Sequence, residues 1–261
     1  MQPEEAYTLE EGAGYRVRVG RLRLSLGYEK GMCRLAYRYG SRQVDLDIRP
    51  GTPITGPPEE VTTQSILLSV PARSFSLLPA VPDKPLILFL EDPLRVFPGN
   101  EHRIFFHIPL WVKLVLRGDS YEYTVFDLPP MVFSNTWSGS PESGVLGYSF
   151  RTRIMTEPED RPPGMWALCA VRLHNRTQGE LLLERFVVPV AFLSLYRGGD
   201  RLTTSRASLS FRGETGELQW KFERGAPGYT EGEVLVSGPR EKATRNIFVM
   251  GASLIRSLTG F

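Results

Sequence analysis

Histidine and cysteine are scarce in this sequence, with three histidines and two cysteines among 261 residues. Cys33 and Cys169 form no CxxC motif, so they fit neither a zinc site nor a disulfide framework. His102 and His107 would point to opposite faces of one strand because they are five residues apart. His174 stands beside a turn. The sequence therefore predicts two buried thiols, no metal site and no catalytic histidine.

Long apolar runs are also missing. The longest, around residues 104–116 and 186–196, contain polar residues or proline and are shorter than the roughly 18 to 20 residues of a membrane-spanning helix. The N-terminal stretch MQPEEAYTLEEG is acidic and does not resemble a secretory signal. We therefore expect a cytoplasmic protein with no transmembrane segment and no peripheral contact with a membrane.

What the sequence does contain is alternation of apolar and polar residues along most of its length, interrupted by 25 glycines and 21 prolines. This pattern is typical of many short strands joined by turns. In YRVRVGRLRLSL the apolar residues before and after Gly20 have opposite parity. A bulge or bend at Gly20 would return all of them to one face of the strand.

The segment CRLAYRYGSRQVDLDI predicts a hairpin whose two-residue turn is Gly40-Ser41. Its register would place Leu35 opposite Leu46 on an apolar face, and Arg34 opposite Asp47 on the other face. The C-terminal tail instead spaces its apolar residues as an amphipathic helix does.

Together these patterns predict an all-β protein, an antiparallel β-sandwich that is either one large sandwich or two packed ones, with a C-terminal α-helix. Pro129-Pro130 is the expected seam. The expected domains are an N-terminal sandwich over 1–129, a second sandwich over 130–238 and a helix over 239–261 that packs on the sheet. A single folded unit is the alternative.

The charge of the chain is close to balanced, +2 overall, but arginine is concentrated near the N-terminus. Residues 14–44 hold seven arginines and one lysine against a single acid, Glu29. A positive sheet face for phosphate or another anion is one interpretation. Its candidate residues are Arg16, Arg18, Arg23, Arg34 and Arg38.

A solvated polar face, partly neutralised by Asp45 and Asp47, is the simpler interpretation of these arginines, and the sequence favours it. The two aspartates are also spaced for a hard cation, although the predicted register gives Asp47 an arginine partner. Nucleic-acid binding is not favoured, because Tyr37 and Tyr39 fall with the apolar residues and stacking needs exposed aromatics.

Residues 134–152, SNTWSGSPESGVLGYSFRT, contain serines between glycines, but the Gly-x-Ser-x-Gly spacing of a nucleophile elbow is absent. The stretch instead contains the turn motif Gly139-x-Pro141-x-x-Gly144-x-Leu146-x-Tyr148. With the upstream strands KPLILFLEDPLRVFPGNEHRIFFHIPLWVKLV, this motif resembles the DUF432 family, found mostly in archaea and in some bacteria. The family has no established activity, so the resemblance implies a shared domain and no catalytic residues.

The sequence favours a non-enzymatic protein that acts by binding a protein partner or by self-association. No nucleophile has a plausible base, and no phosphate-binding loop or other cofactor motif is present. An alternative is a small-molecule or carbohydrate binder, including a sugar hydrolase, that uses exposed Trp111 and Trp137 on a concave face or end loops. The arginine face supplies the third hypothesis, an anion-binding surface.

Overall fold

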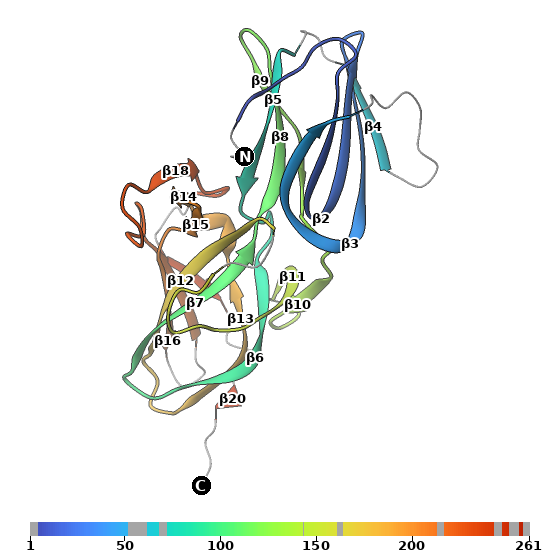
Figure 1. Cartoon of the computed structure of the whole chain (residues 1–261). Coiled ribbons are helices and arrows are strands. Elements are labelled where there is room, and N and C mark those ends of the chain that lie inside the picture. Colours follow the sequence, from blue (N-terminus) through green and yellow to red (C-terminus); the bar gives the residue numbers. More distant parts are fainter. Residues whose placement is uncertain are drawn as a thin grey trace. The chain divides into compact units, whose positions relative to one another are not determined.

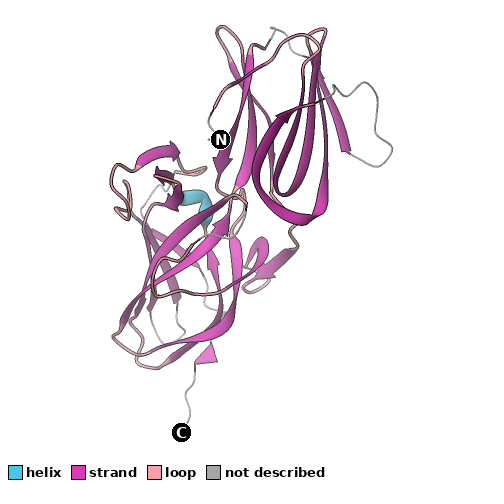
Figure 2. Ribbon diagram, viewed as in Figure 1, coloured by secondary structure: helices cyan, strands magenta, loops and turns pink. Residues whose placement is uncertain are grey.

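The structure, a computed structural model, is built almost entirely of β-strands (Figures 1 and 2). It describes residues 5–51, 62–67, 72–142, 144–160, 164–212, 217–242, 247–250 and 256–257. Across these ranges the helical structure consists of one 3-10 turn, η1 (Val190–Phe192). The predicted all-β class is confirmed.

The chain divides into two compact units, each assembled from separate segments of the sequence. Unit 1 draws on Met1–Ala80, Pro109–Val132 and Pro162–Met165. Unit 2 draws on Val81–Ile108, Phe133–Arg161 and Trp166–Phe261. The domain boundaries expected from the sequence, 1–129, 130–238 and 239–261, stay a prediction.

Unit 1 contains two antiparallel sheets. One has the strand order β1-β5-β8-β9, and the other has the order β2-β3-β4. The long, curled β2–β3 pair carries most of the second sheet (Figure 1). The strands are β1 (Tyr7–Thr8), β2 (Gly14–Glu29), β3 (Met32–Pro50), β4 (Thr62–Leu67), β5 (Ser74–Ala80), β8 (Trp111–Arg117) and β9 (Glu122–Leu128).

The two sheets of unit 1 share an aromatic core. The ring of Tyr15 on β2 lies 4.9 Å from that of Phe75 on β5, edge to face, and Tyr7 on β1 stacks on Phe75 at 5.1 Å. Such rings bury large apolar areas and add about 0.5–1.5 kcal/mol per pair through their geometry. That these two sheets form a β-sandwich stays a prediction.

The hairpin predicted at Gly40-Ser41 is wrong, because β3 runs through these residues as one strand. The turn that joins β2 to β3 is Lys30-Gly31, between paired Glu29 and Met32. Lys30 has φ 51° and Gly31 has φ 73°, as a two-residue type I′ turn requires. The predicted pairs of Leu35 with Leu46 and Arg34 with Asp47 therefore do not form.

The predicted irregularity at Gly20 is confirmed, and β3 bulges at the same place in the ladder. Gly20 pairs with Val44 and Leu22 pairs with Tyr39. A single residue of β2, Arg21, thus faces the four residues 40–43 of β3, so the Gly40-Ser41 turn signal marks a wide bulge. The apolar residues on both sides of Gly20 are buried, as the parity argument predicts: Val17, Val19, Leu22, Leu24 and Leu26.

Hydrogen bonds connect the Gly20 bulge to the segment that follows β9. The carbonyl oxygen of Pro130 accepts hydrogen bonds from the backbone N–H groups of Arg21 at 2.7 Å and Leu22 at 3.1 Å. The Tyr39 hydroxyl donates to the carbonyl oxygen of Pro129 at 3.1 Å. The Pro129-Pro130 pair therefore binds the irregular centre of the β2–β3 ribbon.

Unit 2 also contains two sheets. One has the order β10-β11-β6-β13-β20, and the other has the order β18-β14-β15-β12-β16-β17-β19, with β7 also paired to β12. Phe106 on β7 and Phe186 on β13 meet between the sheets at 6.0 Å. The strands are β6 (Leu86–Val96), β7 (Glu101–Pro109), β10 (Asn135–Ser138), β11 (Val145–Thr152), β12 (Trp166–Asn175), β13 (Leu181–Val188), β14 (Leu195–Gly198), β15 (Arg201–Thr204), β16 (Ala207–Arg212), β17 (Glu217–Phe222), β18 (Val234–Ser237), β19 (Ile247–Met250) and β20 (Arg256–Ser257).

The sheets of unit 2 are mixed, so the purely antiparallel arrangement predicted from the sequence is wrong. β11 runs parallel to β6, and β12 runs parallel to both β15 and β16. Parallel neighbours require crossover connections. β12 and β16 are joined through β13, which lies in the other sheet, and then β14 and β15.

The predicted C-terminal helix is not seen. The described part of the tail consists of β19, which pairs with β17, and β20, which pairs with β13. Residues 243–246, 251–255 and 258–261 lie outside the described residues. In β19 the apolar run IFVM continues a sheet ladder, and tertiary pairing of this kind overrides a helical spacing.

Replacing Gly20 with alanine tests the bulge. The added Cβ would lie 2.7 Å from the Pro130 oxygen, and the backbone φ of +56° is strained for any L side chain. We expect Gly20→Ala to lower the free energy of unfolding by more than about 2 kcal/mol, measured by urea denaturation.

Gly238→Ala is the control, because Gly238 has no positive φ and nothing lies within 4 Å of its added Cβ. This variant should stay within about 0.5 kcal/mol of the wild type. Equal losses in the two variants would contradict the role assigned to the Gly20 bulge.

Candidate functional site

Four of the five arginines predicted to form an anion-binding face come together in a groove on the β2–β3 ribbon. The groove has a volume of about 770 Å³. Arg34, the fifth, lies opposite Gly27 and is not among the lining residues. The polar lining comprises Arg16, Arg18, Arg23, Arg38 and Arg42, with Ser25, Tyr39 and Ser41.

The curl of the ribbon and the alternation of its side chains produce this clustering. On β2, Val17 and Leu24 belong to the buried face, so their neighbours Arg16, Arg18 and Arg23 point the other way. On β3, Arg38 is exposed and pairs directly with Arg23. The arginines of the two strands therefore share one surface.

Like charges stand opposite each other at two positions of this ladder. Arg23 pairs with Arg38, and Arg16 pairs with Arg49. Directly opposed like charges destabilise an antiparallel sheet. Partial burial, and then the charges of Arg18 and Arg38, lower the pKa of Arg23 from its ordinary value, although it stays protonated at physiological pH. The like charges of Arg23 and Arg38 therefore strain the ladder electrostatically.

Arg23 in the groove and Arg21 beside it stabilise the bulge at residues 40–43. Arg23 donates to the carbonyl oxygens of Gly20 at 3.0 Å, Leu22 at 2.9 Å and Arg42 at 2.6 Å. Arg21 donates to the carbonyl oxygen of Gly40 at 2.8 Å. These bonds fix the backbone that carries Arg42, and they leave contact with a ligand to the other guanidinium groups.

The two aspartates expected to neutralise the arginine face have other partners. Asp47 pairs with Arg49 at 3.0 Å, and Asp45 accepts a hydrogen bond from the backbone N–H of Gly164 at 2.9 Å. In the part of the chain that the structure describes, no carboxylate forms an ion pair with Arg16, Arg18 or Arg38. Asp47 also lies opposite Arg18 in the β2–β3 ladder, so a carboxylate stands next to these arginines. The simpler hypothesis of a solvated, partly neutralised face therefore stays a prediction, as does the anion-binding face.

Sequence reasoning missed Arg42 and Ser41, because it placed them in a hairpin turn and on the outgoing strand. In the structure the bulge returns both to the wall of the groove. The parity change at Gly20 could have predicted their position. An irregularity in one strand of a pair requires a matching adjustment in the partner strand, which here is β3.

Trp111 and Trp137 differ in exposure. Trp111 is 2% exposed on β8, so its ring belongs to the core of unit 1 and offers no face to a ligand. Trp137 is 50% exposed on β10. It pairs across the β10–β11 hairpin with Leu146, which is 48% exposed. Together they form an apolar cross-strand pair at the edge of the sheet, with Trp137 on the edge strand β10 and Leu146 on β11.

The family-like turn motif builds this hairpin. Gly139 has φ 115°, a conformation that favours glycine. A Cβ on Gly144 would lie 2.3 Å from the indole nitrogen of Trp137. That nitrogen donates to the carbonyl oxygen of Ser140 at 3.2 Å, within the turn that also contains Pro141. The glycines therefore make room for the backbone turn and for the indole ring that lies over it.

Tyr148 anchors the same hairpin to the rest of its sheet. Its hydroxyl donates to Asp83 at 3.0 Å, and the ammonium of Lys84 lies 5.0 Å from its ring centre. Gly147 lets β11 approach β6, because a Cβ there would lie 2.5 Å from the Pro85 oxygen. The motif residues have structural roles in this arrangement.

Other reactive groups are few in the residues that the structure describes. Burial raises the pKa of both Cys33 and Cys169 to about 12, so neither thiol is a ready nucleophile. No group of three or more His, Cys, Asp or Glu side chains there could hold a metal ion. No helix in this part of the chain is long and apolar enough to cross a membrane.

Arg38→Gln tests the strain in the groove. Removing the charge opposite Arg23 should raise the free energy of unfolding by a few tenths of a kcal/mol at low ionic strength. The gain should shrink as added salt screens the repulsion, which urea denaturation at two salt concentrations would measure. Arg151→Gln, an exposed position opposite Phe89 on β6, is the control. A salt-independent loss in Arg38→Gln would contradict the assignment.

No curated protein and no solved structure matches the chain. A family model described as a protein of unknown function (DUF432) matches residues 5–254, which include the arginine-lined groove and the Gly139–Tyr148 hairpin. Because the match extends over nearly the whole sequence, the chain belongs to the DUF432 family.

Proposed function

We propose that this protein acts by binding, and that its ligand is a small polyanion held in the arginine-lined groove of unit 1. The observation that carries the proposal is the convergence on one groove of arginines from two paired strands, among which Arg16, Arg18 and Arg38 form no ion pair with a described residue. An anion in the groove would offset the repulsion between Arg23 and Arg38. The free energy of binding would therefore be more favourable than at a single isolated arginine.

The dimensions of the groove favour a small molecule with more than one anionic group. Its volume of about 770 Å³ falls within the roughly 300–1,000 Å³ of small-molecule sites. The arginines of β2 are distributed over several residue rises of about 3.3 Å each. Guanidinium groups bind phosphate and carboxylate through paired hydrogen bonds, so phosphorylated or polycarboxylated compounds fit best.

The chemistry of the groove supports a non-enzymatic role. The lining serines, Ser25 and Ser41, have neither a histidine nor a carboxylate among the other lining residues, so no base is at hand to activate them. Tyr39 lines the groove, but its hydroxyl is engaged with Pro129. The groove therefore lacks the series of exposed rings that would favour single-stranded nucleic acid. A cytoplasmic location remains the expectation.

The double variant Arg18→Gln/Arg38→Gln tests this proposal. Calorimetric titration with tripolyphosphate and with citrate should show saturable binding to the wild type, tighter for the more highly charged ligand and weaker with added salt. The variant should bind at least tenfold more weakly, since each charge-assisted hydrogen bond contributes about 1.5–3 kcal/mol.

Arg151→Gln/Arg212→Gln is the matched control, because it removes the same charge from exposed positions outside the groove. Its affinity for tripolyphosphate should stay within about twofold of the wild type, the change expected from surface charge alone. Equal weakening in both double variants would show a net-charge effect and overturn the proposed site, as would the absence of binding to the wild type.

A second candidate function, association with a protein partner or with another copy of the chain, is favoured by the β10–β11 hairpin. β10 is an edge strand of its sheet. Trp137 on β10 and Leu146 on the neighbouring β11 form an exposed apolar pair there. Edge strands pair readily with another chain, and exposed aromatic residues are common anchors of interfaces. A second copy of the chain is the simplest partner of this kind.

Leu146→Ser tests self-association without disturbing the indole contact with Gly144. In light scattering over a concentration series, the wild type should form dimers and Leu146→Ser should remain monomeric at concentrations at least tenfold higher. Val132→Ser, at another exposed apolar residue, should behave as the wild type. A strictly monomeric wild type at all concentrations would contradict this function.

A further inference from the structure

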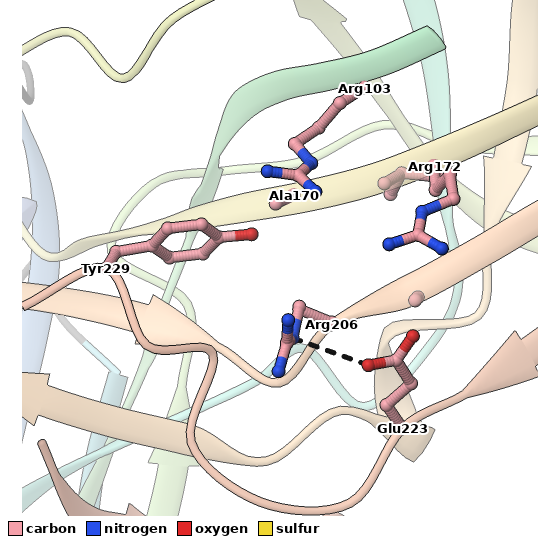
Figure 3. Close-up of a pocket in the computed structure, with 8 residues that line it drawn as sticks. Arg103, Ala170, Arg172, Arg206, Glu223 and Tyr229 are labelled. Carbon is pink, nitrogen blue, oxygen red and sulfur yellow. Dashed lines mark ion pairs between the residues drawn. The ribbon is translucent and has the colours of Figure 1, made fainter. Parts of the chain in front are cut away.

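A second arginine cluster lies on the larger sheet of unit 2, independent of the groove in unit 1. Arg103 belongs to β7 and Arg172 to β12, and Arg206 directly precedes β16. Their side chains surround one small pocket, into which Tyr229 projects from the loop after β17 (Figure 3). The strands fix this arrangement, because β12 pairs with both β7 and β16.

Tyr229 is held firmly at the pocket. Its ring meets Phe105 edge to face at 5.7 Å and packs on the buried cluster that contains Met155 and Leu168. The carboxylate of Glu233 accepts hydrogen bonds from the backbone N–H groups of Gly228 at 2.7 Å and of Tyr229 at 3.1 Å. The loop therefore places the phenol with little freedom to move.

The hydroxyl of Tyr229 points into the space between Arg103 and Arg206 (Figure 3). Its oxygen is buried and has no hydrogen-bond partner among the described residues. Leaving a buried hydroxyl without a partner costs about 1–3 kcal/mol. The arrangement is therefore incomplete, and an acceptor in the pocket would complete it.

The charges around the pocket favour an anion over a water molecule as that acceptor. Arg206 pairs with Glu223 at 3.3 Å, and Arg172 pairs with Glu101 at 3.0 Å. Arg103 has no ion pair with any residue that the structure describes. Two of the three guanidinium groups therefore have a carboxylate partner. The positive charge of Arg103 is the one left beside the hydroxyl.

We propose that this pocket binds one small monovalent anion, such as a halide or the carboxylate of a small acid, through the Tyr229 hydroxyl and the Arg103 and Arg206 guanidinium groups. The pocket volume of about 10 Å³ leaves room for about one small group beside the hydroxyl. The small pocket suits a single anionic group, unlike the wide groove of unit 1.

Chloride-35 NMR line broadening tests the proposal on the full chain. The wild type should show a saturable component that formate displaces. Tyr229→Phe keeps the ring packing and removes the hydroxyl, and Arg103→Gln removes the unpaired charge. Each should weaken chloride binding about five- to tenfold, as expected for the loss of one hydrogen bond to a charged group.

Tyr123→Phe and Arg212→Gln make the same chemical changes at exposed positions outside the pocket and should leave the broadening unchanged. The effect of Tyr229→Phe should also be the same in the Arg18→Gln/Arg38→Gln background, since independent sites give additive effects. Equal broadening by the wild type, Tyr229→Phe and Arg103→Gln would overturn the proposal and leave water as the occupant of the pocket.

Discussion

The two hydrogen bonds that the Pro130 carbonyl accepts from Arg21 and Leu22 are the constraint on which the rest of unit 1 depends. They hold Gly20 at a left-handed backbone angle and let the apolar residues on both sides of it face one core. The same irregularity keeps Arg16, Arg18 and Arg23 on one surface of β2 and places Ser41 and Arg42 of β3 beside them. A backbone contact between distant segments therefore creates the charged groove.

The sequence predicted those features that depend on neighbouring residues. The all-β class follows from the alternation, and the Gly20 bulge follows from a parity change within ten residues. The turn at Lys30-Gly31 escaped prediction because lysine rarely has a positive φ, whereas Gly40-Ser41 resembled a better turn. The parallel pairs and the strand β19 depend on distant partners, which no local pattern specifies.

The candidate site was predictable to a similar extent. The alternation that predicts buried Val17 and Leu24 also predicts that the arginines next to them point away from the core. Their concentration into a groove, and the contribution of Arg42, required the bulge on β3. The pocket of Tyr229 was beyond sequence reasoning, because its residues come from β7, β12, the start of β16 and a loop, and only the tertiary fold brings them together.

The interleaving of the two units has a consequence for synthesis of the chain. Unit 1 takes its last segment from Pro162–Met165, where Gly164 donates to Asp45 and the Met165 carbonyl oxygen accepts from the Leu110 N–H. On a ribosome the first unit thus lacks these contacts until well over half of the protein has emerged. Folding that waits for such distant partners is slow, so the early strands of unit 1 stay without these contacts during much of translation.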